Sequence, residues 1–305
     1  MQINCIYELS MTLDADDFNK LSTLFGTDIS DNDLYTDNTY TEKGVITLFK
    51  NSRYKKKVKL HINTALFLKD GKNRSDKLIY KLRKWISEYF DGEYNVYDFT
   101  VTKFTAVGFI DTGNSSLASR YIKVLSRIGK VKGFSPACFE GVDKGLLLSG
   151  NSNGIDFLLY DLGKNGRDSF NGIICSEVRL NKIQTIRFYA DKTDTSEQIR
   201  KLFDNCKGIF MDTFSHIIPT GDYYKKGEAE EIICKNVDDV KLRRHMMHLV
   251  ALIPDKKSLL LAQKALDYRK VYSVMDSFAE IGLSPITISK RQDIKHLKSI
   301  YSFIQ

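Results

Sequence analysis

The first half of the chain alternates between segments with the two-residue period of a strand and segments with the period of an amphipathic helix. Strands are predicted at residues 3–9, 44–49, 54–66, 94–110, 145–149, 155–160 and 172–180. Helices are predicted over 15–25, where Asp14 can cap the first turn, from Ser75 to the stop at Gly92, and over 115–128. The polar stretch 28–41 is predicted to be a surface loop. Strands and hairpins in this order predict an α+β domain around one antiparallel sheet over residues 1–190.

Helical periodicity dominates from about Thr195 onward. The predicted helices are 197–203, 226–234, 239–249, 257–267 and 270–281. The pattern therefore predicts a second, helical domain over residues 191–305. The segment that follows, led by Ser284 and Pro285, admits two interpretations, a helix-turn-helix or a plain helical hairpin. In the first interpretation Lys290 and Arg291 would contact DNA.

Composition narrows the class of protein. The 305 residues are 42% hydrophobic and 28% charged, which is typical of a folded globular chain. Neither a run of about 18 apolar residues nor the layout of a signal peptide is found, so we expect a cytoplasmic protein without a membrane segment. The five cysteines are scattered and form no CxxC pair, which indicates free thiols and argues against a zinc site of the usual spacing.

The charge balance favours a polyanionic partner. Lys and Arg number 46 against 38 Asp and Glu, a formal charge of +8. A merely solvated basic surface is the alternative. The densest basic stretch is a predicted hairpin that contains Lys50, Arg53, Lys55, Lys56, Lys57 and Lys59. Strand alternation would divide these side chains between two faces, so some must meet solvent or phosphate.

One pair of predicted strands carries residues suited to phosphoryl transfer. Tyr160 ends the strand 155–160, and Glu177 lies on the next strand, which would be adjacent in a hairpin. A tyrosine is a weak nucleophile at neutral pH, and a nearby Lys164 or a divalent cation held by Glu177 would favour the phenolate. Ordinary packing of an aromatic residue at a strand end is the alternative interpretation.

The same region resembles a known family. The run Leu146-Leu147-Leu148-Ser149-Gly150-Asn151-Ser152-Asn153, then Tyr160-Asp161 and Glu177-Val178-Arg179-Leu180, is similar to a block in two groups of proteins. They are the gene II replication proteins of filamentous phages and the Rep initiators of staphylococcal-type rolling-circle plasmids. The resemblance implies an antiparallel nicking domain of the His-hydrophobic-His class, with Tyr160 as the residue that attacks DNA. Glu177 would then be a metal ligand.

The resemblance also implies a bound Mg²⁺ or Mn²⁺ ion. His61, on the predicted strand 54–66, matches the strand that carries metal-binding histidines in the wider superfamily, although a lone histidine is also compatible with a structural role. The family's Arg-Ile-Asp strand appears here as Lys103-Phe104-Thr105, which lacks the acid. Asp111 could replace that acid if the strand bulges, or it could simply end the strand.

The expected function is the initiation of rolling-circle DNA replication by nicking and strand transfer at an origin. The expected partners are double- and single-stranded origin DNA, with host helicase and polymerase as further candidates. A relative that binds DNA but has lost cleavage is the first alternative, because part of the metal shell is missing. An RNA-binding protein on a similar sheet is the second, and it would expose aromatic residues on the sheet face.

Overall fold

A computed structural model describes residues 3–25, 29, 33–69, 74–150, 152–165, 170–191, 194–266, 269 and 271–304. The chain is α+β with a large antiparallel sheet, which confirms the coarse fold class. Two compact units interleave along the sequence. Unit 2 comprises residues 3–107 and 179–209, and unit 1 comprises 108–178 and 210–305. The division falls inside two strands, whereas the sequence pattern placed a single boundary after residue 190.

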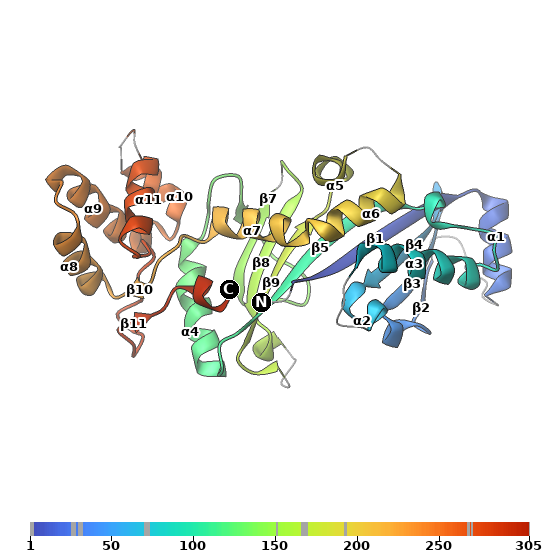
Figure 1. The fold of residues 1–305 in the computed structure, drawn as a ribbon, viewed down its shortest axis with the longest axis horizontal. Helices are drawn as coiled ribbons and strands as arrows, with labels where there is room; N and C mark the ends of the chain where they lie inside the picture. The colour runs from blue at the N-terminus through green and yellow to red at the C-terminus, as the bar shows by residue number, and fades with distance from the viewer. Residues whose placement is uncertain are drawn as a thin grey trace. The chain divides into compact units, whose positions relative to one another are not determined.

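The strands of unit 2 follow the order β2-β3-β4-β1-β5 (Figure 1). Their bounds are β1 (Ile3–Leu13), β2 (Leu34–Asp37), β3 (Val45–Ser52), β4 (Lys55–Asn63) and β5 (Thr100–Asp111, of which residues 108–111 belong to unit 1). The register places Glu8 opposite His61 and Leu48 opposite Lys59. Because side chains alternate along a strand, these residues share one face, and Tyr7 lies on the other.

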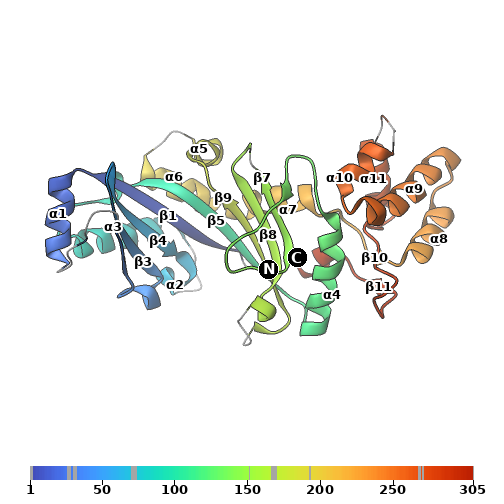
Figure 2. The ribbon, with the colours of Figure 1, turned by 180° about the vertical axis from the view of Figure 1, so that it is seen from behind.

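The described helices of unit 2 lie on one face of this sheet. The helices of unit 2 are α1 (Ala15–Leu24), α2 (Thr64–Leu68), α3 (Ser75–Tyr89), α5 (Ile183–Ala190) and α6 (Thr195–Asp204). On the covered face the Tyr7 hydroxyl donates to the Ile199 carbonyl at 3.1 Å, and the rings of Phe25 and Phe49 lie 5.1 Å apart. Figure 2 shows the opposite face of β1, β3, β4 and β5 turned to the viewer, with α3 and α6 behind it. The face that carries Glu8 is therefore open.

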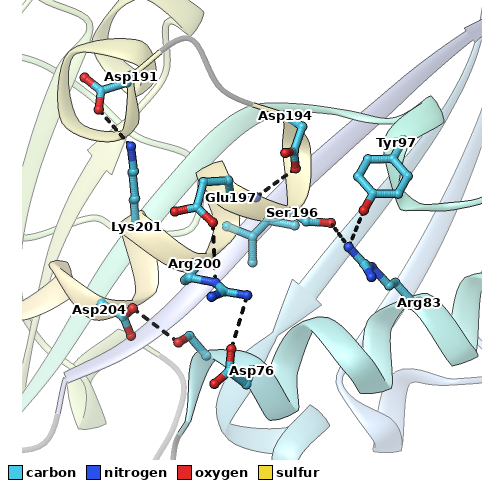
Figure 3. Close-up of polar contacts among 12 residues, drawn as sticks. Asp76, Arg83, Tyr97, Asp191, Asp194, Ser196, Glu197, Arg200, Lys201 and Asp204 are labelled. Carbon is cyan, nitrogen blue, oxygen red and sulfur yellow. Dashed lines mark hydrogen bonds and ion pairs between the residues drawn. The ribbon is translucent and has the colours of Figure 1, made fainter.

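Polar contacts fasten α6 to α3, about 120 residues earlier in the chain (Figure 3). Arg200 bridges Asp76 on α3, at 3.2 Å, and Glu197 on its own helix, at 3.5 Å. Arg83 of α3 donates to the Ser196 hydroxyl at 3.2 Å. Asp194 caps α6 by accepting from the Glu197 amide at 3.0 Å. These contacts explain why residues 179–209 belong to the same unit as residues 3–107.

Unit 1 contains the strand order β9-β8-β7-β6 and most of the C-terminal helices. The strands are β6 (Ser135–Pro136), β7 (Gly145–Gly150), β8 (Ile155–Asp161) and β9 (Ile173–Leu180, of which the last two residues belong to unit 2). The helices are α4 (Ser115–Leu125), α7 (Cys206–Ile217, which begins in unit 2), α8 (Lys226–Asn236), α9 (Val240–Lys256), α10 (Leu259–Ala265) and α11 (Val271–Glu280). Phe157 of β8 packs against Phe214 of α7, with ring centroids 6.0 Å apart.

The structure corrects the predicted pattern at several places, among them residues 64–66, which were predicted as strand and begin α2. Strand β2 lies inside the predicted loop 28–41, of which residues 28 and 30–32 fall outside the described residues. Helices α5 and α7 were not predicted. The segment after α11 is neither a helix-turn-helix nor a helical hairpin. It is extended and bridges Leu283 to Asp222 and Ile288 to Lys225, and the short strands β10 (Tyr223–Tyr224) and β11 (His296–Leu297) pair. Pro285 and the β-branched residues 286–288 favour extended backbone over a helix.

Candidate functional site

Tyr160 and Glu177 lie side by side on β8 and β9, as the hairpin pattern predicted. The Tyr160 hydroxyl donates a hydrogen bond of 2.7 Å to Oε1 of Glu177, and the Cys175 Sγ lies 3.8 Å from the same oxygen. Both side chains are buried, with 7% of Tyr160 and 9% of Glu177 exposed. Opposite Tyr160 on β7 stands Gly145, where an added Cβ would lie 2.4 Å from the Leu159 carbonyl oxygen. The backbone is therefore closely packed at Tyr160, and the buried hydroxyl is hydrogen-bonded to Glu177.

The surroundings of Tyr160 favour its protonated form. Burial is the main reason that the pKa of the phenol is raised well above its usual value, and the neighbouring Cys175 and Glu177 raise it further. A phenolate at this position would be desolvated and would face a carboxylate, and both effects oppose the charge. For attack on a phosphate the proton would have to pass to an acceptor, and the carboxylate of Glu177 is the group in contact with it.

Lys164 does not join this pair. It belongs to the short 3-10 helix η4 (Gly163–Asn165) and lines a cleft together with Asp161. Asp161 follows Tyr160 on β8, so the two side chains point to opposite faces of the strand. Asp161 is 3% exposed and accepts a bond of 2.9 Å from the Ser119 hydroxyl of α4. No contact between the ammonium group of Lys164 and Tyr160 is found among the described residues.

The three predicted metal ligands each have other contacts. Glu177 accepts from Tyr160, and His61 Nε2 lies 3.4 Å from Oε2 of Glu8. Asp111, at the end of β5, accepts from the Gly113 amide at 2.8 Å, which is a turn contact. Over the described part of the chain, no three His, Cys, Asp or Glu side chains gather closely enough to hold one ion. The bound Mg²⁺ or Mn²⁺ ion stays a prediction.

A different polar cluster lies on the open face of unit 2, around the carboxylate of Glu8. Lys59 Nζ is 3.2 Å from Oε1, Lys103 Nζ is 3.5 Å from Oε2, and the Thr102 hydroxyl donates to Oε1 at 2.9 Å. His61 completes the cluster. Alternation along β5 slips by one residue at this point, because neither Thr102 nor Lys103 is buried. Both of these neighbours can therefore reach the same carboxylate.

The charges of this cluster are set by burial and by the lysines. Burial raises the pKa of Glu8, but the Thr102 hydrogen bond and the charges of Lys103 and Lys59 outweigh it, so the pKa lies below its usual value. Burial lowers the pKa of His61, and the two lysines add to this effect against the opposing charge of Glu8. At neutral pH the cluster therefore holds one carboxylate, two ammonium groups and an uncharged imidazole.

The predicted basic hairpin contributes to the same face in part. The register pairs Lys50 with Lys57, and alternation aligns both with Lys55 and Lys59, so these four side chains share the open face with Lys103. Five lysines against Glu8 leave four positive charges in excess there. No aromatic residue of β1–β4, or of the part of β5 in unit 2, points to this face.

The other predicted DNA contacts lie elsewhere. Lys56 points to the opposite face of β4, where its ammonium group donates to Asn51 at 2.6 Å and lies 5.4 Å from the Phe18 ring centroid. Arg53, in the turn before β4, stacks over the Tyr54 ring at 5.6 Å. Lys290 and Arg291 are exposed in a turn of the C-terminal segment of unit 1, which the Gln292 amide closes on the Ser289 carbonyl at 3.0 Å.

Sequence reasoning missed Glu8 and Lys103 as members of a site. Glu8 was hidden inside a segment interpreted as an ordinary strand, and Lys103 was noted only for the acid missing from its neighbourhood. The available signal was a charged residue, Glu8, at an alternating position among apolar ones. Ser10 and Thr12 follow it on the same face of the strand.

Comparisons with known proteins give no relative. The chain matches no protein-family model, no curated protein and no solved structure. Among the described helices, none combines the length and apolar character that crossing a membrane requires.

Proposed function

We propose that this chain binds DNA through the open sheet face of unit 2. The observation that carries the proposal is the group of lysines on that face, Lys50, Lys55, Lys57, Lys59 and Lys103, around Glu8. Lysines spaced along adjacent strands can follow a row of backbone phosphates, and each neutralised phosphate releases condensed counterions. Because the face lacks aromatic side chains on which bases could stack, backbone contacts to a duplex suit it better than single-stranded RNA.

The process we assign to this binding is the initiation of rolling-circle replication. That assignment rests on the resemblance to the phage gene II and plasmid Rep proteins, and the large antiparallel sheet is compatible with it. The geometry fits the DNA-binding relative better than an active nickase, because Tyr160 is buried, protonated and hydrogen-bonded. We therefore propose an origin-binding protein in which cleavage is absent or needs a rearrangement of β8 and β9.

A double variant tests the DNA-binding proposal. Lys50→Gln/Lys57→Gln removes two charges from the open face that make no ion pair in the described part of the chain. Duplex binding is measured by fluorescence anisotropy over a series of salt concentrations. We expect several-fold weaker binding and a plot of log K against log salt that is shallower by about 1.8, from roughly 0.9 for each lost phosphate contact. Lys207→Gln/Lys256→Gln, on α7 and α9, removes two exposed charges that also make no ion pair in the described part of the chain, and as the matched control it leaves the slope unchanged. An equal slope in the parent and the first variant refutes the proposal.

Nicking by Tyr160 is the second candidate function, favoured by the contact between its hydroxyl and a carboxylate. In that reaction the phenol oxygen attacks the phosphorus as Glu177 takes the proton. The bond from the phosphorus to the 3′-oxygen breaks, the 3′-oxygen takes a proton from water to become a hydroxyl, and a 5′-phosphotyrosyl bond remains. Supercoiled DNA that carries the replication origin of the phage or plasmid encoding the chain is incubated with the parent or with Tyr160→Phe. Each reaction is run with Mg²⁺ or Mn²⁺ and, separately, with a chelator. A nicked product and a covalent adduct that the variant lacks would establish this function, and intact DNA with binding retained would exclude it.

A further inference from the structure

A cleft of about 680 Å³ in unit 1 lies outside both the tyrosine pair and the open face of unit 2. One wall is the face of α4 that carries Ser119 and Ile122. The other is formed by residues 143–145, at the start of β7, and by residues from Asp161 to Asn165, at the end of β8 and in η4. Its lining residues are Ser119, Ile122, Lys123, Ser126, Asp143, Lys144, Gly145, Asp161, Lys164 and Asn165. This volume is typical of a site for a small molecule.

Hydrogen bonds hold the floor of the cleft in place. Besides its bond to Ser119, Asp161 accepts from the Asn165 side chain through its backbone carbonyl, at 2.7 Å. Asn165 also accepts from the Asp143 amide, at 3.1 Å. These bonds tie η4 to the segment before β7, and they leave the side chain of Asp143 exposed at the cleft. The walls are therefore fixed without a ligand, which lowers the entropy cost of binding one.

Three lysines from separate segments surround this space. Lys123 comes from α4, Lys144 precedes β7, and Lys164 belongs to η4. All three are exposed, and within the described part of the chain none of their ammonium groups has an ion-pair or hydrogen-bond partner. Like charges grouped around one cleft repel each other, and a bound anion would offset that repulsion. The carboxylates of Asp143 and Asp161 also line the cleft and offset two of the three positive charges, which leaves one in excess.

We propose that this cleft binds a nucleoside phosphate. The three ammonium groups would hold the phosphate oxygens, and the exposed carboxylate of Asp143 would accept from a sugar hydroxyl. The side chain of Ile122 and the aliphatic stems of the lysines supply apolar surface for a base. A bare phosphate would leave most of the volume empty. The ligand is either a free nucleotide or the phosphorylated end of a DNA strand, since both present the same chemistry.

Calorimetric titration of the full chain tests this site with three probes. They are ATP, inorganic phosphate, and a short oligonucleotide with or without a 5′-phosphate. We expect ATP to bind more tightly than inorganic phosphate. If the natural ligand is a strand end, the 5′-phosphorylated oligonucleotide binds more tightly than its 5′-hydroxyl form, and if it is a free nucleotide the two forms bind equally while ATP still binds. The parent binding none of the probes would overturn the proposal.

Variants of the three lysines locate the binding. Lys123→Gln/Lys144→Gln/Lys164→Gln should weaken ATP binding by about 30-fold, from roughly threefold for each exposed charge. The corresponding triple Arg variant keeps the charges and should retain binding. Lys207→Gln/Lys241→Gln/Lys256→Gln removes the same charge from exposed helical positions and should have no effect. ATP binding that is unchanged in the first variant would contradict the proposal.

The site can be tested apart from the proposed function. Lys50→Gln/Lys57→Gln should weaken duplex binding and leave ATP binding intact, because those lysines do not line the cleft. A parent chain that binds ATP but no duplex would refute the proposed function and leave this inference standing.

Discussion

Replacing Tyr160 by Phe removes one hydroxyl group from the tyrosine–glutamate pair and changes little else in shape. The lost contact is a hydrogen bond of 2.7 Å between two side chains that are each more than nine-tenths buried. If Tyr160 is a structural residue of unit 1, this substitution must lower the free energy of unfolding. A tyrosine that acts only after it is exposed to DNA would contribute little to the free energy of unfolding.

The size of the effect follows from the charge and burial of the pair. A hydrogen bond to a charged group is worth about 1.5–3 kcal/mol, and the loss of the hydroxyl also removes a donor from a buried carboxylate. We therefore expect Tyr160→Phe to cost about 2 kcal/mol. Glu177→Gln keeps an oxygen that accepts from Tyr160 but loses the charge, so the double variant should show a coupling energy of about 1 kcal/mol.

Urea unfolding measures these free energies, with two optical signals that separate the units. Far-UV circular dichroism follows the helices and strands of both units. The single tryptophan, Trp85, lies on α3, so its fluorescence reports on unit 2. A cost for Tyr160→Phe below about 0.5 kcal/mol, or a coupling energy of zero with Glu177→Gln, would refute the structural role assigned to the pair.

Three further predictions concern unit 2. Because the pKa of Glu8 is lowered in the folded state, its contribution to stability is present above about pH 4.5 and is lost as the pH falls through the folded-state pKa. The urea midpoints of the parent and of Glu8→Gln, followed by Trp85 fluorescence from pH 3 to 7, should therefore differ less in acid. A difference that stays constant with pH would contradict this. Gly44→Ala should lower the free energy of unfolding by about 3 kcal/mol, because φ is +79° and the new Cβ would lie 2.6 Å from the Asn63 carbonyl oxygen. Gly92→Ala, at φ +80° with open space around it, should lower it by only about 1 kcal/mol. Equal losses of unfolding free energy in the two variants would show that the close approach at Gly44 is relieved. Asp194→Ala should lower the free energy of unfolding by about 1 kcal/mol, because α6 loses its N-terminal cap. Asp194→Asn should lower it by much less, because asparagine also caps helices well. The same loss in both variants would show that the effect does not come from capping.

Local patterns in the sequence predicted most of the secondary structure. Asp14 was expected to cap a helix at residue 15, and its side chain accepts from the Asp17 amide at 2.8 Å. The helix from Ser75 and the strands that carry Tyr160 and Glu177 also formed where periodicity placed them. These features depend on neighbours within a few residues, which the sequence displays directly.

Long-range pairing could not be predicted in the same way. No pattern in the sequence indicated that α6 would contact α3 through Arg200 and Asp76, because contacts between residues so far apart leave no periodic signal. The predicted boundary at residue 190 was placed by helical periodicity, which carries no information about the interleaving of the two units.

In the candidate site, too, local features could be predicted from the sequence and long-range contacts could not. Period-two alternation in the sequence already separated Lys56 from Lys57 and Lys59, and Tyr160 from Asp161. Only the register between strands decided that Glu8 would lie beside His61 and Lys59, and only the packing of α4 against β8 placed Lys164 in a cleft with Lys123. The sequence by itself determined which face of its own strand each side chain takes, since that depends on the local backbone. Tertiary structure decided which charges meet, since that depends on segments brought together only by folding.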